Sequence, residues 1–129
     1  MANKKLKIGV LFGGKSAEHE VSIISAGKVI DALDKGKYVV TKHKIPKDGK
    51  FDFNILKKYD VVVPILHGQF GEDGTIQGLL KLIDVPFVGA SVLGSAVGMD
   101  KDVMKRLLRD AGIPVAKFIA FKKVNVTSF

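Results

Sequence analysis

Apolar residues in this chain gather in short continuous runs that are separated by more polar stretches. A continuous apolar run of roughly four to eight residues is typical of a strand buried on both faces of a sheet. The runs predict strands at residues 6–12, 38–45, 61–66, 85–89 and 115–121. The second of these is more polar than the first, so we expect it nearer an edge of the sheet.

Between the runs, apolar residues recur every three or four positions, as on the buried face of an amphipathic helix. This spacing predicts helices over residues 17–34, 52–59, 76–83 and 104–111. Asp73 is available to cap the third of these helices, and Asp100 is expected to cap the fourth. The alternation of strands and helices predicts an α/β fold with a parallel, Rossmann-like sheet.

Composition narrows the class of protein further. The 129 residues are 47% hydrophobic and include no cysteine, which fits one globular domain in a reducing compartment. The N-terminal apolar run is too short for a membrane span and lacks the layout of a signal peptide. We therefore expect a cytoplasmic protein that does not bind a membrane.

The net charge of +8 raises the question of nucleic-acid binding. The lysines are scattered, however, and no aromatic ladder is interleaved with them as stacking on single strands would require. A solvated lysine surface that attracts anionic substrates explains the charge better, and we expect no nucleic-acid partner.

Two glycine-rich loops carry the candidate chemistry, each placed after a predicted strand and before a helical segment. They span residues 13–22 and 67–74. In a parallel α/β sheet both loops lie at the carboxyl ends of strands, which is where ligands bind. The pair predicts a small-molecule site.

The first loop also matches the phosphate-binding pattern G-x-x-x-x-G-K-[ST], over Gly9 to Ser16. The context disagrees, because the apolar residues after Gly9 continue the strand and leave only four residues as loop. No aspartate ends the third strand, where such proteins hold Mg²⁺; His67 follows it instead. A P-loop nucleotidase is thus a third-ranked hypothesis.

Individual residues in the loops support alternative interpretations. Glu18 is either a helix-stabilising carboxylate or a partner for a substrate ammonium. His67 is a candidate proton-handling group, and Glu72 is placed to hold its tautomer. His19 is expected at the surface, and Lys101 by itself is best explained as an ordinary surface lysine.

Taken together, three spaced motifs closely resemble those of the D-alanine–D-alanine ligases. They are Gly13-Gly14-x-Ser16-x-Glu18-x-Glu20-Val21-Ser22, His67-Gly68-x-x-Gly71-Glu72-Asp73-Gly74-x-x-Gln77-Gly78 and Met99-Asp100-Lys101. That family joins two D-alanines for bacterial peptidoglycan with ATP and Mg²⁺, through an acyl phosphate. The resemblance implies a pre-ATP-grasp version of the Rossmann-like fold, a three-layer sandwich with a mainly parallel sheet.

By the same resemblance, Glu18 anchors the ammonium of the first D-alanine, with Val21 against its methyl group and His67 near its carboxylate. Ser16 and Glu72 are expected to support these residues without contacting the substrate, and Lys101 reaches the ATP phosphates. The family precedent is a homodimer.

The resemblance also implies a division of the chain. Residues 1–98 correspond to the N-terminal substrate domain, and residues 99–129 to the first elements of the central ATP-grasp domain. The nucleotide pocket and the Mg²⁺ ligands have no counterpart here, so we expect a folded fragment that is inactive alone. D-alanine–D-lactate or D-alanine–D-serine ligases, and a stand-alone Rossmann-like binding module, are the alternatives. A gene that ends at Phe129 would favour the module.

Overall fold

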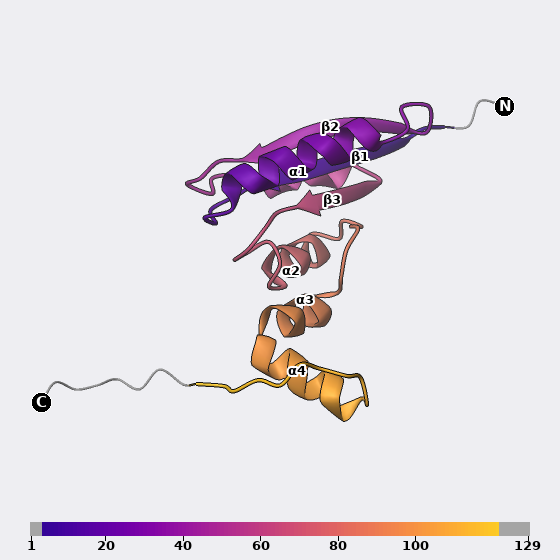
Figure 1. The fold of residues 1–129 in the computed structure, drawn as a ribbon. Coiled ribbons are helices and arrows are strands. Elements are labelled where there is room, and N and C mark those ends of the chain that lie inside the picture. The colour runs from indigo at the N-terminus through magenta and orange to yellow at the C-terminus, as the bar shows by residue number, and fades with distance from the viewer. Residues whose placement is uncertain (1–3, 122–129) are drawn as a thin grey trace, which may run out of the picture.

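Three parallel strands form the centre of the computed structural model, which describes residues 4–121. The strands are β1 (Leu6–Gly13), β2 (Tyr38–Ile45) and β3 (Val61–Ile65), in the order β2-β1-β3. Strand β1 pairs over its whole length with β2 and over five residues with β3. The polar strand β2 therefore lies at the edge, as predicted, and the apolar β1 lies in the middle (Figure 1).

Helices cover both faces of this sheet and give three layers. Helix α1 (His19–Ala32) packs on one face, and the 3₁₀ helix η1 (Phe53–Lys58) and helix α2 (Thr75–Leu82) pack on the other. Each face has its own cluster of buried side chains, because successive residues of β1 point to opposite sides. Val10 faces α1, whereas Leu11 faces η1 and α2, and neither is exposed. The predicted Rossmann-like α/β sandwich is confirmed.

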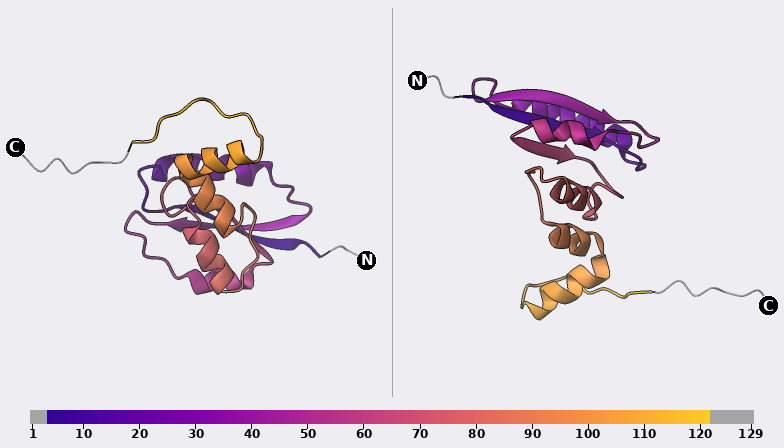
Figure 2. Two further views of the ribbon diagram at one scale, coloured as in Figure 1. Left: turned by 90° about the horizontal axis from the view of Figure 1, so that it is seen from below. Right: turned by 180° about the vertical axis from the view of Figure 1, so that it is seen from behind.

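Two further helices extend the chain away from the sheet. Helices α3 (Val92–Met99) and α4 (Lys101–Asp110) follow α2 one after another, so that α4 lies farthest from β2 (Figures 1 and 2). Asp100 caps α4, as predicted, by accepting hydrogen bonds from the N–H groups of Asp102 and Val103. Across residues 4–121, no helix has the length and apolar character needed to span a bilayer.

Two of the predicted strands are wrong. Residues 85–89 form a single parallel bridge, between Phe87 and Val62 of β3, rather than a strand. Pro86 lacks an N–H group, so the segment exchanges hydrogen bonds with only one residue of β3. Residues 115–121 have no regular structure, because no strand edge within the described residues lies beside them.

The helix predictions need smaller corrections. The first helix begins at His19 rather than at residue 17, and the segment at 52–59 is a 3₁₀ helix. Helix α3 was not predicted, since its small and apolar residues give no amphipathic stripe; its one local signal is Ser91, which caps it by accepting from the N–H of Gly94.

Gly9, the first residue of the apparent P-loop match, lies inside β1 rather than at its end. A Cβ atom at this position would be 2.7 Å from the ring of Tyr59, which is itself buried. The glycine is therefore required by the packing of an aromatic ring against the strand. The loop that follows has only the last residues of the pattern, and the P-loop interpretation loses its basis.

We expect Gly9→Val to lower the free energy of unfolding by about 1–3 kcal/mol, because the added side chain overlaps the Tyr59 ring. Gly27→Ala is the matched control, since no atom lies within 4 Å of a Cβ at this position in α1. That change should stabilise the protein by up to about 1 kcal/mol through helix propensity. Urea unfolding of both variants tests the pair, and a neutral Gly9→Val would contradict the packing argument.

The stability of the sheet edge should depend on pH through His43. The ring of His43 lies in β2, and its Nε2 atom is 2.7 Å from the Tyr59 hydroxyl. Burial, and next the positive charge of Lys58, lower the pKa of His43 below its usual 6.5. The fold thus favours the neutral ring of His43. This contribution to the free energy of unfolding is fully present above the pKa of the unfolded state, and it is lost as the pH falls from that pKa through the lower pKa of the folded state.

NMR titration of the ring protons should give a midpoint for His43 below 6.5, and urea unfolding should show stability falling with acid over the same range. His43→Phe should weaken this pH dependence. A midpoint at or above 6.5 would contradict the prediction.

Candidate functional site at the carboxyl edge of the sheet

The first loop leaves β1 through two glycines in a backbone conformation that other residues rarely adopt. Gly13 has φ of 89° and Gly14 has φ of 90°. A Cβ atom on Gly13 would lie 2.5 Å from the carbonyl oxygen of Ile45, at the end of the neighbouring strand β2. The two glycines therefore let the chain turn tightly against β2 and enter helix α1.

Glu18 occupies the N-cap position of α1. Its side chain is exposed and makes no capping hydrogen bond to the helix, which weakens the purely helix-stabilising interpretation. The carboxylate extends to the second loop instead, because a Cβ atom on Gly68 would lie 2.9 Å from Glu18 Oε1. A carboxylate in this position can pair with the cationic group of a small molecule.

His67 and Glu72 face each other across the second loop. His67 Nδ1 is 3.5 Å from Glu72 Oε1, and Glu72 Oε2 accepts a hydrogen bond from the N–H of Gly68. One carboxylate thus contacts both the imidazole and the backbone of the loop. Among the described residues, His67 Nε2 is buried without a hydrogen-bond partner.

Ser16 connects the two loops directly. Its hydroxyl donates to the carbonyl oxygen of His67 at 2.7 Å and accepts from the N–H of Glu18 at 3.1 Å. The Glu18 backbone and the His67 backbone are therefore held by one oxygen atom. The structure brings together Ser16, Glu18, His67 and Glu72, four of the residues singled out in the sequence.

Two buried residues at the start of α1 also support this edge, and the sequence interpretation missed both. His19, expected at the surface, is only 4% exposed, and its Nδ1 atom is 2.6 Å from the carbonyl oxygen of Gly14. Ser22 is fully buried and hydrogen bonds to β1 and β3. The prediction for His19 was wrong because its ring turns inward beneath the glycine turn.

The second loop is held by Asp73 and by an unusual backbone conformation. Phe70 has φ of 69°, which is strained for a bulky residue, and its N–H donates to Asp73 Oδ2. Asp73 also accepts a hydrogen bond from the N–H of Thr75. The predicted N-cap of α2 was Asp73, but the N-cap in the structure is Gly74. Burial alone would raise the pKa of Asp73, but these N–H groups outweigh burial and lower it.

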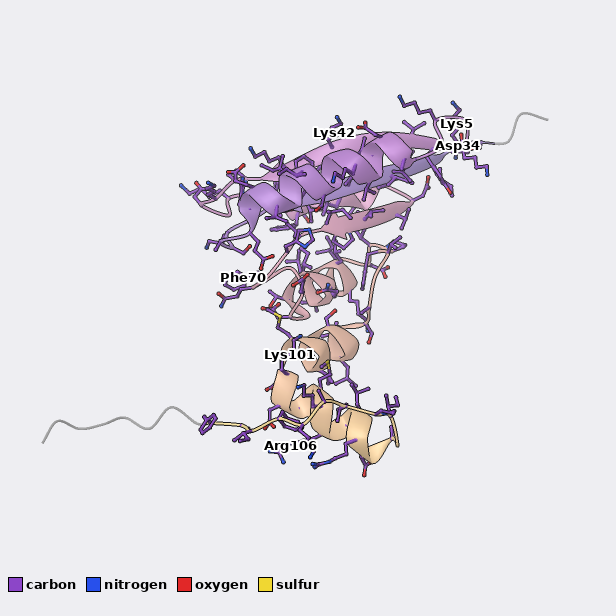
Figure 3. The ribbon with its side chains drawn as sticks, viewed as in Figure 1. Lys5, Asp34, Lys42, Phe70, Lys101 and Arg106 are labelled. Atoms are coloured by element: carbon purple, nitrogen blue, oxygen red, sulfur yellow. The ribbon has the colours of Figure 1, made fainter. Side chains whose placement is uncertain are left out.

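An open hollow of about 470 Å³ lies on one side of the His67 loop. His67 and Glu72 line it together with Lys101. Figure 3 labels Lys101 at the start of α4. Lys101 Nζ donates to the carbonyl oxygen of Gly98 at 2.5 Å, so its charge is held at this hollow. Val21 does not line the hollow and is 51% exposed on α1.

A smaller, mostly apolar cavity of about 190 Å³ lies on the other side of the loop. Lys15, the lysine of the apparent P-loop match, lines it with its aliphatic stem packed on Gly49. A phosphate would find few polar groups there. Within residues 4–121, no three histidine or acidic side chains converge as a magnesium or other metal site would require.

Comparison with known proteins gives a consistent family. The sequence model of the family described as "D-ala D-ala ligase N-terminus" matches residues 7–55 and 52–90. A D-alanine–D-alanine ligase of Oceanobacillus iheyensis is 40% identical over 166 aligned positions, which cover 96% of this chain and 45% of that protein.

Solved structures show the same similarity. The VanG D-Ala:D-Ser ligase from Enterococcus faecalis superimposes with a TM-score of 0.77 at 32% identity, over 88% of this chain and 44% of that one. The D-alanine–D-alanine ligase of Bacillus anthracis complexed with ATP gives 0.73 at 35% identity, over 88% and 40%. The chain thus spans less than half the length of these relatives.

Proposed function

The chain belongs to the family of D-alanine–D-alanine ligase N-terminal domains, and from this premise we propose that it holds the first D-alanine of such a ligase. The observation that carries the proposal is the position of the Glu18 carboxylate over Gly68, beside His67. An amino acid offers an ammonium and a carboxylate at fixed separation. A carboxylate and an imidazole on facing loops can bind those two groups and orient them.

Each residue has a distinct role in this proposal. Glu18 pairs with the ammonium, and His67 lies near the substrate carboxylate, where Glu72 orients its ring. Ser16 holds both loops at the required spacing. Val21, exposed on the first turn of α1, contacts the methyl group of the substrate.

The proposed reaction uses ATP, which the Bacillus anthracis relative binds. The carboxylate of the first D-alanine attacks the γ-phosphorus and releases ADP, which leaves an acyl phosphate. The amine of a second D-alanine then attacks the acyl carbon, the peptide bond forms, and phosphate leaves. Mg²⁺ neutralises phosphate charge in such chemistry, and we assign no described residue to it. Lys101 provides a positive charge toward the phosphates from the hollow beside His67.

We propose that residues 1–98 form the substrate domain and that residues 99–129 begin the next domain. Helix α4 supports this division, because none of its residues is buried and Leu107 on it is 51% exposed. An apolar helix face of this kind requires a further packing partner. The first domain, in contrast, has two complete cores of its own.

The family precedent of a homodimer belongs to the same proposal. Ile24 on the outer face of α1 is 61% exposed, and exposed apolar side chains can bury themselves against a second copy. Sedimentation equilibrium measures this directly, and a monomer at all concentrations would exclude it for this chain.

Titration of the ¹⁵N-labelled chain with D-alanine tests the function. We expect shifts of the amides of Glu18, Gly68 and Gly71, and much smaller shifts with L-alanine. The chain alone should release no ADP from ATP in the presence of D-alanine, because it provides only part of the site. D-alanine-dependent ADP release would contradict this division of roles, and an absence of binding would contradict the proposed site.

A D-alanine–D-serine ligase is the second candidate, because the VanG enzyme is similar over the same region. The two activities differ in the second substrate, to which we assign no described residue. Competition between D-alanine, D-serine and D-lactate in a protein that joins this chain to the rest of such a ligase would separate them.

A further inference from the structure

Ser22 lies in the second turn of α1, directly below Glu18. Its N–H donates to the carbonyl oxygen of Glu18 at 2.9 Å, so the two residues are joined by the first hydrogen bond of the helix. The side chain of Ser22 is completely buried. A serine inside a helix often bonds to its own helix backbone, which weakens the helix. Ser22 does not.

The Ser22 hydroxyl bonds to the ends of two strands. It accepts from the N–H of Gly13, the last residue of β1, at 2.7 Å, and it donates to the carbonyl oxygen of Ile65, the last residue of β3. Ile65 is 43 positions away in sequence and two residues before His67. One hydroxyl therefore fixes helix α1, the start of the first loop and the start of the second.

Ser22 therefore contacts the backbone next to both proposed substrate-binding residues, Glu18 and His67, without reaching the substrate position itself. Ser16 also joins the loops, but it is half-buried, so water can compete for its hydrogen bonds. Water cannot reach Ser22, which is 0% exposed, and removing its hydroxyl leaves the buried N–H of Gly13 unpaired and takes a partner from the partly buried carbonyl oxygen of Ile65. The spacing of Glu18 and His67 thus depends more on Ser22 than on Ser16.

We propose that Ser22 is a positioning residue that sets the separation of Glu18 and His67 in the D-alanine site. This inference rests on the proposed function, since it concerns how the same site is held. It adds a residue that touches no substrate and acts only through the two loops. An altered loop spacing of about 1 Å is enough to weaken recognition strongly.

NMR of the ¹⁵N-labelled chain tests the proposal with Ser22→Ala. In the free protein we expect shifted or broadened amides in residues 15–18 and 67–71, and in the D-alanine titration a dissociation constant raised at least about tenfold. Ser25→Ala, on the same helix, is the control for losing a serine. Ile8→Val is the control for lost core packing, because Ile8 is 4% exposed near the opposite end of β1.

Both controls should keep the wild-type loop amides and the wild-type affinity. If Ser22→Ala does not fold, the loop amides and the D-alanine affinity are measured in Ser22→Cys instead. A thiol is similar in size to a hydroxyl but is a much weaker hydrogen-bond partner. Unchanged loop amides in the Ser22 variant, or equal changes in Ile8→Val, would overturn the proposal. If the wild-type chain itself binds no D-alanine, the proposed function fails, and the loop amides of the free protein still decide the role of Ser22.

Discussion

Glu18→Gln should weaken binding of D-alanine about 10- to 100-fold while leaving the fold intact. A hydrogen bond to a charged group contributes about 1.5–3 kcal/mol, and each 1.4 kcal/mol is a factor of ten in affinity. Glutamine keeps the size of the side chain and removes its charge, so an ammonium loses its ionic partner. The exposed position of Glu18 means that stability should change by less than about 0.5 kcal/mol.

Glu20→Gln is the matched control, two residues along the same helix. Glu20 Oε1 is 3.0 Å from Lys47 Nζ, so the carboxylate points toward the turn after β2 rather than toward Gly68. The hydrogen bond from Lys47, together with its charge, lowers the pKa of Glu20. D-alanine titrations followed by NMR should give wild-type affinity for this variant. Equal losses in the two variants would mean that only net charge matters, and the proposed ammonium site would be wrong.

Leu11→Ala should lower the free energy of unfolding by about 2–5 kcal/mol. Leu11 lies in the central strand, is 0% exposed, and packs with η1 and α2 on one face of the sheet. The substitution removes apolar contacts and leaves a cavity that neighbouring strands cannot close, because both are paired to β1. A loss of this size is a large share of the stability of an ordinary domain, about 5–15 kcal/mol.

Leu82→Ala provides the comparison, since Leu82 is 88% exposed at the end of α2. This change should alter stability by less than about 0.5 kcal/mol. Urea unfolding followed by circular dichroism measures both variants. A small effect of Leu11→Ala would mean that the β1 face is less tightly packed than the structure shows.

The first loop at the carboxyl edge of the sheet shows that a sequence motif must be interpreted together with the strand that precedes it. Gly9 to Ser16 match a phosphate-binding pattern by letter, yet Gly9 packs under the Tyr59 ring and Lys15 lies against Gly49. The apolar residues after Gly9 already predicted that β1 continues through the match and that the segment is not a P-loop. The candidate binding residue of the first loop is then Glu18, whose carboxylate reaches the second loop.

The amino-acid sequence alone predicted the strands β1, β2 and β3, the helices between them, and the position of both loops at one edge of the sheet. These features follow from periodicity and from strand–helix alternation, which are local properties of the chain. Local patterns failed at residues 85–89, where Pro86 limits the pairing with β3 to one bridge, and at residues 115–121, because a strand forms only where a neighbour offers its edge. Nothing in an apolar run states whether that neighbour is present.

The burial of His19 and Ser22, and the approach of Glu18 to Gly68, follow from the fold and not from any local pattern. Each depends on a partner from another segment, such as the carbonyl oxygen of Ile65 for Ser22. A polar residue at the start of a helix has the same sequence pattern whether its side chain meets water or a strand end. The direction in which such a side chain points is set by how α1 packs on the sheet. That packing depends on contacts between residues far apart in the chain.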